Sequence, residues 1–294
     1  MSRRVLITGS KGFTGHYLSS ELDSCGWTVF GTGKGEDPSD PRYRQIDLAD
    51  QDGLRDWIKV VQPDAVVHLA GVAFVGHGQP DAFYRVNLIG TRNLLAAIGD
   101  AAPDVSCVLL ASSANVYGNA QEGVLDESTI PCPANDYAVS KLSMEYMARL
   151  WSKKLPIVIA RPFNYTGVGQ SESFLLPKIV AHFKREAAVI ELGNLDVWRD
   201  FSDVRALVRG YRRLIEVCPQ GEVVNVCSGH VHSLREVLSM AESISGHKLD
   251  IRVNPAFVRE NEVKTLCGDP SRLKHLIGDW ESIPVENTLR WMLE

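Results

Sequence analysis

The amino-acid sequence predicts an α/β protein built on a doubly wound parallel sheet, with a smaller mixed lobe in its C-terminal half. Short apolar runs alternate with helical segments through the first half of the 294 residues, and a glycine-rich turn follows the first run. After Arg161-Pro162 this alternation weakens, and helices are separated by loops rich in Gly, Asn and Ser. Continuous apolar runs are typical of strands covered on both faces, and their alternation with helices implies right-handed crossovers between parallel strands.

The expected strands of the main sheet are apolar runs bounded by turn residues. They are Val5–Thr8, Trp27–Gly31, Ala65–Leu69, Cys107–Ser112 and Ile157–Ala160. The segments between them carry apolar residues at helical spacing. The expected helices are Thr14–Ser24, a segment that includes Leu54–Val61, Ala82–Ile98 and Tyr137–Trp151.

The C-terminal half is expected to form helices near Leu175–Phe183, Val204–Val217 and Leu234–Ser245, and a strand near Val223–Val226 that returns to the main sheet. The predicted division is a first domain over residues 1–162, joined by the helix and strand near 203–226, and a second lobe made mainly of residues 163–294. Ligands of doubly wound sheets bind at the carboxyl ends of the strands, so we expect the second lobe to hold a ligand against that edge.

Composition and charge exclude several classes of protein. Lys and Arg total 31 against 36 Asp and Glu, and this net charge of −5 gives no electrostatic case for a nucleic-acid partner. No apolar segment approaches the roughly 20 residues that span a bilayer, and the N-terminal apolar run is too short for a secretory signal. The six cysteines are scattered without a CxxC pair, which indicates free thiols in a reducing compartment. We therefore expect a cytoplasmic protein with no nucleic-acid or membrane partner and no metal site.

The glycine-rich turn lies directly after the first expected strand. Gly9, Gly12 and Gly15 stand at intervals of three within Thr8–Gly15. Glycine lets the backbone turn sharply and approach a pyrophosphate, and the N-terminus of the following helix offers free N–H groups. A plain tight turn also uses glycine, but the position between the first strand and the first helix favours a dinucleotide-binding loop.

A second group of residues has the chemistry of proton transfer. Tyr137 and Lys141 form a YxxxK pair, and residues i and i+4 of a helix share one face. A nearby lysine ammonium favours the phenolate and lowers the tyrosine pKa, so that the tyrosine can exchange a proton with a carbonyl or an alcohol. A surface Tyr–Lys pair is the alternative. Ser113, 24 residues before Tyr137, follows a buried strand at the sheet edge where ligands bind.

Together these segments resemble the extended short-chain dehydrogenase/reductase family, which combines a TGxxGxxG loop, an upstream serine and a YxxxK pair. The resemblance implies a Rossmann domain that binds NADP(H) or NAD(H). It also implies that Ser113 bonds the substrate oxygen, that Tyr137 transfers its proton, and that Lys141 holds the nicotinamide ribose. The residues expected to bind the cofactor are Gly9, Gly12, Phe13, Gly15, Lys34, Asp47, Leu48, Leu69, Ala70, Gly71, Tyr137, Lys141 and Pro162.

Some of these assignments compete with simpler interpretations. The resemblance places Asp47 against the adenine, although Asp47 could instead cap the helix that follows. The second strand is followed by Lys34, and no carboxylate stands at its end. Because a cation favours binding of the extra phosphate of NADP, we expect NADPH to serve at least as well as NADH. Lys34 could equally be a solvated loop lysine. His68 is expected to be a core histidine and not a catalyst.

The second half of the chain resembles reductases of GDP-4-keto-6-deoxy-D-mannose. Residues 161–170 (RPFNYTGVGQ) and 193–204 (GNLDVWRDFSDV) carry this resemblance. It implies that Arg199 and Arg259 clamp a diphosphate, and that the second lobe is substrate-binding. The other substrate-binding residues that it implies are Asn115, Asn164 at a phosphate or the sugar, Phe174 and Lys178 near the base, and Glu262 at the nucleotide ribose.

Asn115 bears on the type of reaction. The related sugar-nucleotide 4,6-dehydratases carry a glutamate at this position to move a proton, and an amide cannot do so at ordinary pH. We therefore expect reduction, oxidation or epimerisation, and not dehydration. Two other polar residues keep simple interpretations, since Arg199 could pair with Asp196 or Asp200, and Asp203 is expected to cap a helix.

The expected function is the reduction of GDP-4-keto-6-deoxy-D-mannose to GDP-D-rhamnose by NAD(P)H. The alternatives are a nucleotide-sugar 4-epimerase that keeps NAD tightly bound, and a reductase of a UDP- or dTDP-4-keto sugar. A cofactor-binding regulator without catalysis is disfavoured by the complete set of Ser113, Tyr137 and Lys141. The resemblance also implies a homodimer through the helices Ala82–Ile98 and Tyr137–Trp151.

Overall fold

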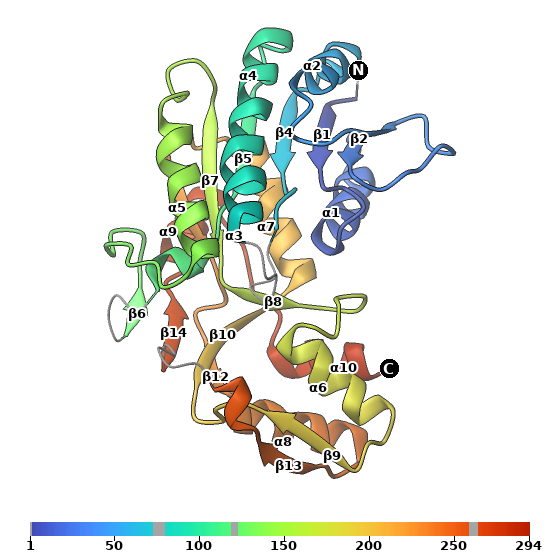
Figure 1. Ribbon diagram of the computed structural model, residues 1–294, viewed down its shortest axis with the longest axis vertical. Coiled ribbons are helices and arrows are strands. Elements are labelled where there is room, and N and C mark those ends of the chain that lie inside the picture. Colours follow the sequence, from blue (N-terminus) through green and yellow to red (C-terminus); the bar gives the residue numbers. More distant parts are fainter. Residues whose placement is uncertain (1, 73–79, 119–122, 259–263) are drawn as a thin grey trace.

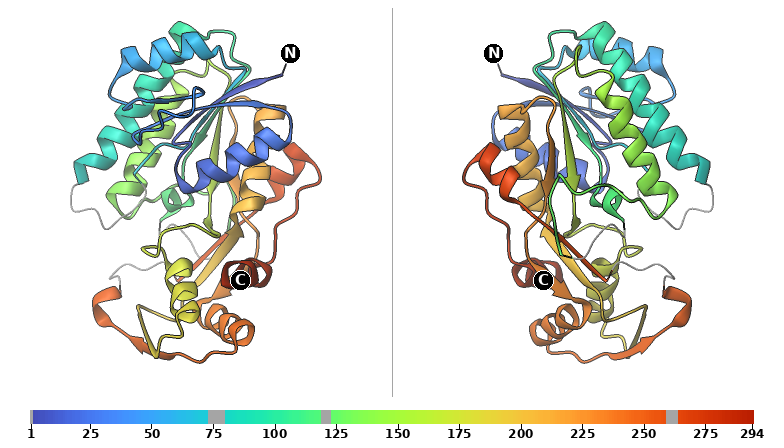
Figure 2. Two further views of the ribbon diagram at one scale, coloured as in Figure 1. Left: turned by 90° about the vertical axis from the view of Figure 1, so that its right-hand side faces the viewer. Right: turned by 90° about the vertical axis from the view of Figure 1, so that its left-hand side faces the viewer.

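The computed structural model describes residues 2–72, 80–118, 123–258 and 264–294. Figure 1 shows a sheet with helices on both faces and a smaller lobe beneath the carboxyl ends of its strands. The side views in Figure 2 show the same two layers of helices on either side of the sheet. This arrangement confirms the predicted α/β class.

In the described residues the main sheet has seven parallel strands in the order β11-β7-β5-β4-β1-β2-β3. They are β1 (Arg4–Thr8), β2 (Thr28–Gly33), β3 (Tyr43–Gln45), β4 (Ala65–His68), β5 (Cys107–Ala111), β7 (Ile157–Pro162) and β11 (Val223–Val226). Every residue of β4 and β7 is buried, because helices cover both faces of the sheet. The pairing of β11 with β7 confirms that this late segment returns to the main sheet.

The helices form two layers, and each layer closes an apolar core against the sheet. One layer consists of α2 (Gln51–Val61), α3 (Pro80–Phe83), the π-helical segment η1 (Tyr84–Gly90), α4 (Thr91–Ala101) and α5 (Asp136–Arg149). The other consists of α1 (Phe13–Ser24), α7 (Val204–Val217) and α9 (Ser271–Ile277).

The single helix predicted over Ala82–Ile98 is wrong in one respect, because η1 interrupts it. Within η1, Asn87 is buried, and its side chain accepts a hydrogen bond from the Val72 N–H and donates one to the Ser140 hydroxyl. These bonds tie the segment to the loop after β4 and to α5. Apolar spacing does not encode such side-chain bonds, and π-helical turns are frequent at functional sites.

The second lobe is mixed, as predicted. Its central strand β10 (Trp198–Asp203) pairs antiparallel with one strand and parallel with two others. The remaining strands are β6 (Val124–Leu125), β8 (Asn164–Thr166), β9 (Val189–Leu192), β12 (Val231–Ser233), β13 (Asp250–Val253) and β14 (Thr265–Gly268). The remaining helices are α6 (Leu175–Lys184), α8 (Leu234–Ser245), α10 (Val285–Leu293) and the short 3-10 turns η2 (Ala114–Tyr117) and η3 (Pro255–Phe257).

Capping residues explain why α7 and α8 begin where the sequence predicts. The Asp203 carboxylate accepts a hydrogen bond from the Arg205 N–H, which confirms Asp203 as a helix cap. Ser233 and Glu236 form a reciprocal capping box at the start of α8. β11 belongs to the main sheet and α7 packs against that sheet. The second lobe is therefore built from segments that lie both before and after α7 and β11 in the chain (Figure 1).

Candidate active site

The glycine-rich turn brings its backbone against the loop that follows β4. Gly9 has a left-handed φ of +73°, and its N–H donates to the Thr32 carbonyl at 2.7 Å. A Cβ at Gly9 would lie 2.9 Å from the Ala70 nitrogen, and a Cβ at Gly15 would lie 2.3 Å from the Gly9 carbonyl oxygen. Only glycine fits at these two positions, so the backbone forms a cradle that a side chain would fill.

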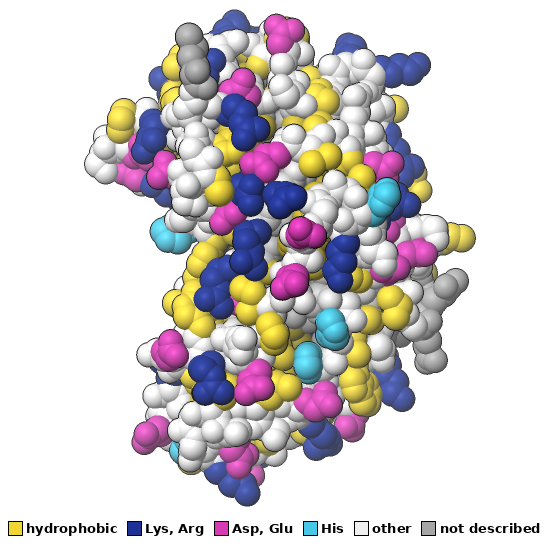
Figure 3. Space-filling model, turned by 180° about the vertical axis from the view of Figure 1, so that it is seen from behind, with side chains coloured by type: hydrophobic (Ala, Val, Ile, Leu, Met, Phe, Trp, Pro, Cys, Tyr) yellow, Lys and Arg dark blue, Asp and Glu magenta, His cyan; other side chains and the backbone are white. Residues whose placement is uncertain are grey.

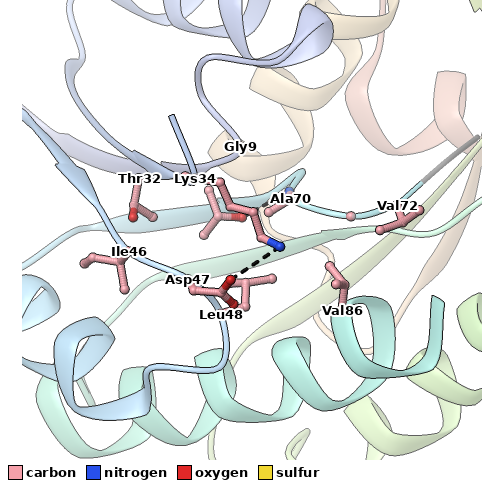
Figure 4. Close-up of a pocket in the computed structure, with 12 residues that line it drawn as sticks. Gly9, Thr32, Lys34, Ile46, Asp47, Leu48, Ala70, Val72 and Val86 are labelled. Carbon is pink, nitrogen blue, oxygen red and sulfur yellow. Dashed lines mark hydrogen bonds and ion pairs between the residues drawn. The ribbon is translucent and has the colours of Figure 1, made fainter. Parts of the chain in front are cut away.

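A pocket of about 220 Å³ lies beside this cradle at the carboxyl ends of β1, β2 and β4 (Figure 4). The residues that line it are Thr8, Gly9, Thr32, Gly33, Lys34, Ile46, Asp47, Leu48, Ala70, Gly71, Val72 and Val86. Within the described part of the chain the buried Thr32 hydroxyl has no hydrogen-bond partner. An apolar pocket with an unsatisfied hydroxyl beside a glycine cradle fits the adenosine half and pyrophosphate of a dinucleotide.

Lys34 and Asp47 face each other across this pocket, with Nζ and Oδ2 3.3 Å apart (Figure 4). Asp47 does not cap α2, because Asp50 occupies that position and accepts from the Gly53 N–H. The Asp47 carboxylate instead accepts from the Ala49 N–H, and this bond together with Lys34 lowers its pKa. Both side chains are exposed, at 71% for Lys34 and 52% for Asp47. An exposed ion pair contributes about 0–1 kcal/mol, so a phosphate can compete for Lys34.

The other residues predicted to bind the cofactor lie around the same edge of the sheet. Leu69 and Ala70 donate backbone N–H groups to Thr8, at 3.1 Å to its carbonyl and 3.2 Å to its hydroxyl. Phe13 begins α1, and its ring stacks on Tyr165. Pro162 ends β7 and is buried.

The three residues predicted to be catalytic meet at the carboxyl end of β5. Ser113 follows β5, and its hydroxyl hydrogen-bonds the Tyr137 hydroxyl. Lys141 lies one turn further along α5 and donates from Nζ to the Ala111 carbonyl at 2.7 Å. A Cβ at Gly71 would lie 3.5 Å from the Lys141 Nζ, which places the ammonium beside the pocket wall. Tyr137 and Lys141 are only 8% and 7% exposed, so the alternative of a surface Tyr–Lys pair is wrong.

Burial dominates the proton affinities of this group. It raises the pKa of Tyr137 to about 12, against the opposing hydrogen bond from Ser113. The expectation that Lys141 brings this pKa below its usual value is therefore not met, because desolvation of the phenolate dominates and the opposing contribution comes from Ser113. Burial also lowers the pKa of Lys141 to about 8, and the Glu145 carboxylate opposes that shift.

His68 is a core residue, as predicted. It is buried between two hydroxyls, with Nδ1 2.7 Å from the Thr8 Oγ1 and Nε2 2.9 Å from the Thr91 Oγ1. Burial and the nearby Lys141 ammonium lower its pKa to about 3, so the imidazole is neutral.

The residues predicted to bind substrate that the structure describes lie on η2, β8 and β10 and at the start of α6. Asn115 is exposed in η2, two residues after Ser113. Asn164 on β8 lies opposite Phe201 on β10, two residues from Arg199. Arg199 donates from Nη1 to the Trp198 carbonyl at 2.9 Å. The two aspartates that could have paired with Arg199 bind other groups. Asp196 pairs with Arg235, and the buried Asp200 accepts hydrogen bonds from Ser228 and Gly229.

Phe174 and Lys178 stand at the start of α6. Lys178 donates to the Glu191 carbonyl at 2.7 Å, and its Nζ lies 4.7 Å from the centre of the Phe257 ring. Phe174 precedes α6 and is 37% exposed. Arg259 and Glu262 lie outside the described residues.

Sequence reasoning missed two kinds of residue. Thr32, Ile46, Val72 and Val86 line the pocket, although no motif marks them. A buried ion pair beside Lys141, between Glu145 and Arg161, was also missed. Glu145 stands four residues after Lys141, and this spacing was the one signal that could have revealed it.

The surface carries charges of both signs. Figure 3 shows Lys and Arg side chains gathered across the middle of the back face, with Asp and Glu among them.

Across the described ranges, no helix combines the length and the apolar character that crossing a bilayer requires.

Comparison with known proteins places this geometry in a family. A family model described as GDP-mannose 4,6 dehydratase matches residues 6–292. A GDP-6-deoxy-D-talose 4-dehydrogenase of Aggregatibacter actinomycetemcomitans is 36% identical over 277 residues, covering 94% of this chain and 92% of its own. A GDP-6-deoxy-D-mannose reductase of Pseudomonas aeruginosa is 35% identical over 311 residues, covering 100% of this chain and 97% of its own.

Solved structures agree in fold. A Burkholderia cenocepacia J2315 protein, proposed to be an epimerase, has a TM-score of 0.94 at 52% identity and covers 99% of this chain and 97% of its own. RMD from Pseudomonas aeruginosa, complexed with NADPH, has a TM-score of 0.87 at 33% identity, with coverages of 100% and 97%. MoeE5, in complex with UDP-glucuronic acid and NAD, has a TM-score of 0.89 at 27% identity, with coverages of 99% and 97%. The chain belongs to the extended short-chain dehydrogenase/reductase family, of the NAD-dependent epimerase/dehydratase type, and is an NAD(P)-dependent oxidoreductase that modifies a nucleotide sugar.

Proposed function

We propose that the protein reduces the 4-keto group of GDP-4-keto-6-deoxy-D-mannose to give GDP-D-rhamnose. The observation that carries this proposal is the buried group of Ser113, Tyr137 and Lys141 beside a glycine-lined dinucleotide pocket. Two curated relatives at 36% and 35% identity, both named for GDP-6-deoxyhexoses, support the choice of substrate.

In the proposed reaction the protein binds the keto sugar and supplies the proton. The Ser113 hydroxyl donates a hydrogen bond to the C4 carbonyl oxygen, and the Tyr137 hydroxyl transfers its proton to that oxygen as the alkoxide forms. The high pKa of Tyr137 suits this direction, because the phenol stays protonated until the oxygen becomes basic. Bound NADPH supplies the hydride that adds to C4. The Lys141 ammonium compensates the charge left on Tyr137 and holds the nicotinamide ribose.

The GDP moiety would be held by the second lobe. Arg199 and Arg259 would bind the diphosphate, Asn164 a phosphate oxygen or the sugar, and Glu262 the ribose hydroxyls. The pairing of β8 with β10 supports this assignment, because it brings Asn164 and Arg199 to neighbouring strands. Lys178 would lie by the base.

Stereochemistry at C4 separates the two curated relatives. 6-Deoxytalose and 6-deoxymannose differ in configuration at that carbon alone, so the face on which hydride adds decides the product. Asn115 stands where dehydration would need a carboxyl group, and we propose that the enzyme does not dehydrate its substrate. The GDP-6-deoxytalose isomer is the other product that assays should seek.

A 4-epimerase that retains NAD is a second candidate, favoured by the 52% identical protein that is proposed to be an epimerase. The two functions differ in their use of cofactor. A reductase consumes one added NADPH for each sugar, whereas an epimerase turns over without added cofactor and releases NAD only on denaturation. Cofactor content of the purified protein, measured with turnover of UDP- and GDP-hexoses, separates them.

The pH dependence of reduction follows from Lys141. Its pKa is lowered from 10.5 to about 8, so the ammonium is present below that pH and is lost as the pH rises through it. Tyr137, with its pKa of about 12, stays protonated over the same range. We expect kcat/KM for the keto sugar to be level below pH 8 and to fall about tenfold per pH unit above it. A profile that stays level well above the Lys141 pKa would contradict this role for Lys141.

The preference for NADPH should depend on Lys34. Replacing Lys34 by Ala removes the cation at the end of β2, and a charge-assisted bond to a phosphate contributes about 1.5–3 kcal/mol when shielded. Because Lys34 is 71% exposed, we expect a smaller effect, a rise of about fivefold in the KM for NADPH, with the KM for NADH unchanged. Equal changes for both cofactors would show that Lys34 does not meet the extra phosphate.

We also propose a cytoplasmic homodimer. Exposed apolar side chains on and beside η1 and α5 support the family arrangement, namely Ile89, Val139, Tyr146 and Leu150. Sedimentation at micromolar concentration tests it.

A further inference from the structure

A fully buried ion pair lies directly behind the proposed catalytic group. Arg161 on β7 donates to both carboxylate oxygens of Glu145 on α5, at 2.9 Å from Nε and 2.6 Å from Nη2. The two side chains are 4% and 1% exposed. The Arg161 guanidinium also lies 4.9 Å from the centre of the Tyr117 ring.

This pair connects the three segments that carry the proposed active-site residues. Glu145 lies on α5, one turn after Lys141 and two turns after Tyr137. Its Oε1 also accepts from the Ser112 hydroxyl at 2.5 Å, and Ser112 immediately precedes Ser113. Arg161 immediately precedes Pro162 at the end of β7. One carboxylate therefore sets the positions of α5, the end of β5 and the end of β7 relative to one another.

Stability alone gives no reason for this pair. Removing two charges from water is costly, and well-packed apolar side chains of similar size commonly stabilise a core as well or better. The pair lies beside residues whose separation and charge decide proton transfer. Its placement indicates a role in the chemistry.

The charged and titratable groups around Lys141 indicate how Glu145 affects the Lys141 pKa. The ammonium interacts with Glu145 from its own helix and with His68 from β4, and Tyr137 lies one turn before it on α5. Tyr137 is protonated and His68 is neutral at ordinary pH, since their pKa values are about 12 and about 3. Among the described residues that act on Lys141, Glu145 supplies the negative charge, and it opposes the loss of the Lys141 proton.

We propose that Glu145, held in place by Arg161, is a positioning residue, which keeps Lys141 in the ammonium form and, through Ser112, holds Ser113 at a fixed separation from Tyr137. This inference rests on the proposed ketoreduction. It adds to that function a residue that touches neither the substrate nor the cofactor.

The test replaces Glu145 by Gln, which keeps the size of the side chain and removes its charge. We expect the Lys141 pKa to fall by about one unit or more, because a unit charge is lost at close range in a buried site. The alkaline limb of kcat/KM should move to lower pH by the same amount, about a tenfold loss of rate at a pH above the limb, with the KM for NADPH changed by less than about threefold. The pKa is read by NMR of carbon-labelled lysine, with the Lys141 signal assigned from Lys141→Met.

Glu127→Gln is the matched control. Glu127 is also a shielded carboxylate, 6% exposed, which accepts from the Asn225 N–H at 2.7 Å and pairs with Arg272. Its loss should lower the melting temperature without moving the Lys141 pKa. If Glu145→Gln lowers the melting temperature but leaves the Lys141 pKa at its wild-type value, the pair is structural only and the inference is wrong.

A double variant and a substrate-free titration test the role of Glu145 independently of folding of the single variant and of enzyme activity. If Glu145→Gln does not fold, Glu145→Gln combined with Arg161→Met removes both charges, and a smaller fall in the Lys141 pKa is expected, because no uncompensated Arg161 charge is left. The NMR titration needs no substrate. A wild-type protein inactive on keto sugars would therefore refute the proposed function, while the titration would still decide whether Glu145 controls Lys141.

Discussion

Replacing Tyr137 by Phe is expected to abolish reduction of the keto sugar while NADPH still binds. The Phe ring fits the same buried position, where the Tyr137 ring packs edge-on against the Phe83 ring with the ring centres 5.9 Å apart. Phe has no hydroxyl proton to transfer. A positioned general acid contributes about 10²- to 10⁴-fold, so we expect kcat to fall by that factor. Fluorescence titration with NADPH should give a Kd within about threefold of wild type, because the hydroxyl is one contact among many.

Tyr146→Phe is the control for this experiment. Tyr146 lies on the same helix and is 56% exposed, so its hydroxyl should be dispensable for both turnover and NADPH binding. Full activity in Tyr137→Phe would show that another group supplies the proton.

Replacing Gly9 by Ala is expected to weaken cofactor binding strongly. The new Cβ would lie 2.9 Å from the Ala70 nitrogen and 3.0 Å from its Cα, so the loop must shift at the wall of the dinucleotide pocket. The φ of +73° adds strain of about 1–2 kcal/mol for a residue with a side chain. Overpacking costs about 1–3 kcal/mol more, and we expect the Kd for NADPH to rise about 10- to 100-fold.

Gly26→Ala separates the two causes. Gly26 has a similar φ of +81°, but nothing lies within 4 Å of a Cβ placed there. It should lose stability from strain alone and bind NADPH as the wild type does. Equal NADPH affinity in Gly9→Ala and wild type would contradict the assignment of the glycine-rich turn to the pyrophosphate.

The main sheet could be predicted because burial on both faces leaves a direct trace in the sequence. Val66 and Leu109 belong to apolar runs that are too short for helices. Val66 lies in β4, in which every residue is buried, and Leu109 lies in β5, in which only the last residue is half-buried. The second lobe was less predictable. β6 pairs with β14 through Val124 and Cys267, and local patterns do not reveal partners so distant in the chain.

The site was predictable where its chemistry follows a fixed spacing. The meeting of Ser113, Tyr137 and Lys141 followed from their order and their positions on a strand end and a helix. Their proton affinities did not follow, because the desolvation that raises the pKa of Tyr137 depends on neighbours from several elements. Glu145 and Arg161 escaped notice for a related reason, since a charged residue in a sequence normally indicates exposed surface.

The measurement that tests the central proposal most directly is the loss of NADPH and NADH absorbance when purified enzyme meets freshly generated GDP-4-keto-6-deoxymannose, followed by identification of the product. We expect rapid oxidation, NADPH at least as effective as NADH, and GDP-D-rhamnose formed in equal amount to the cofactor consumed. Protein that binds NADPH but oxidises none with this substrate would contradict the proposed reduction.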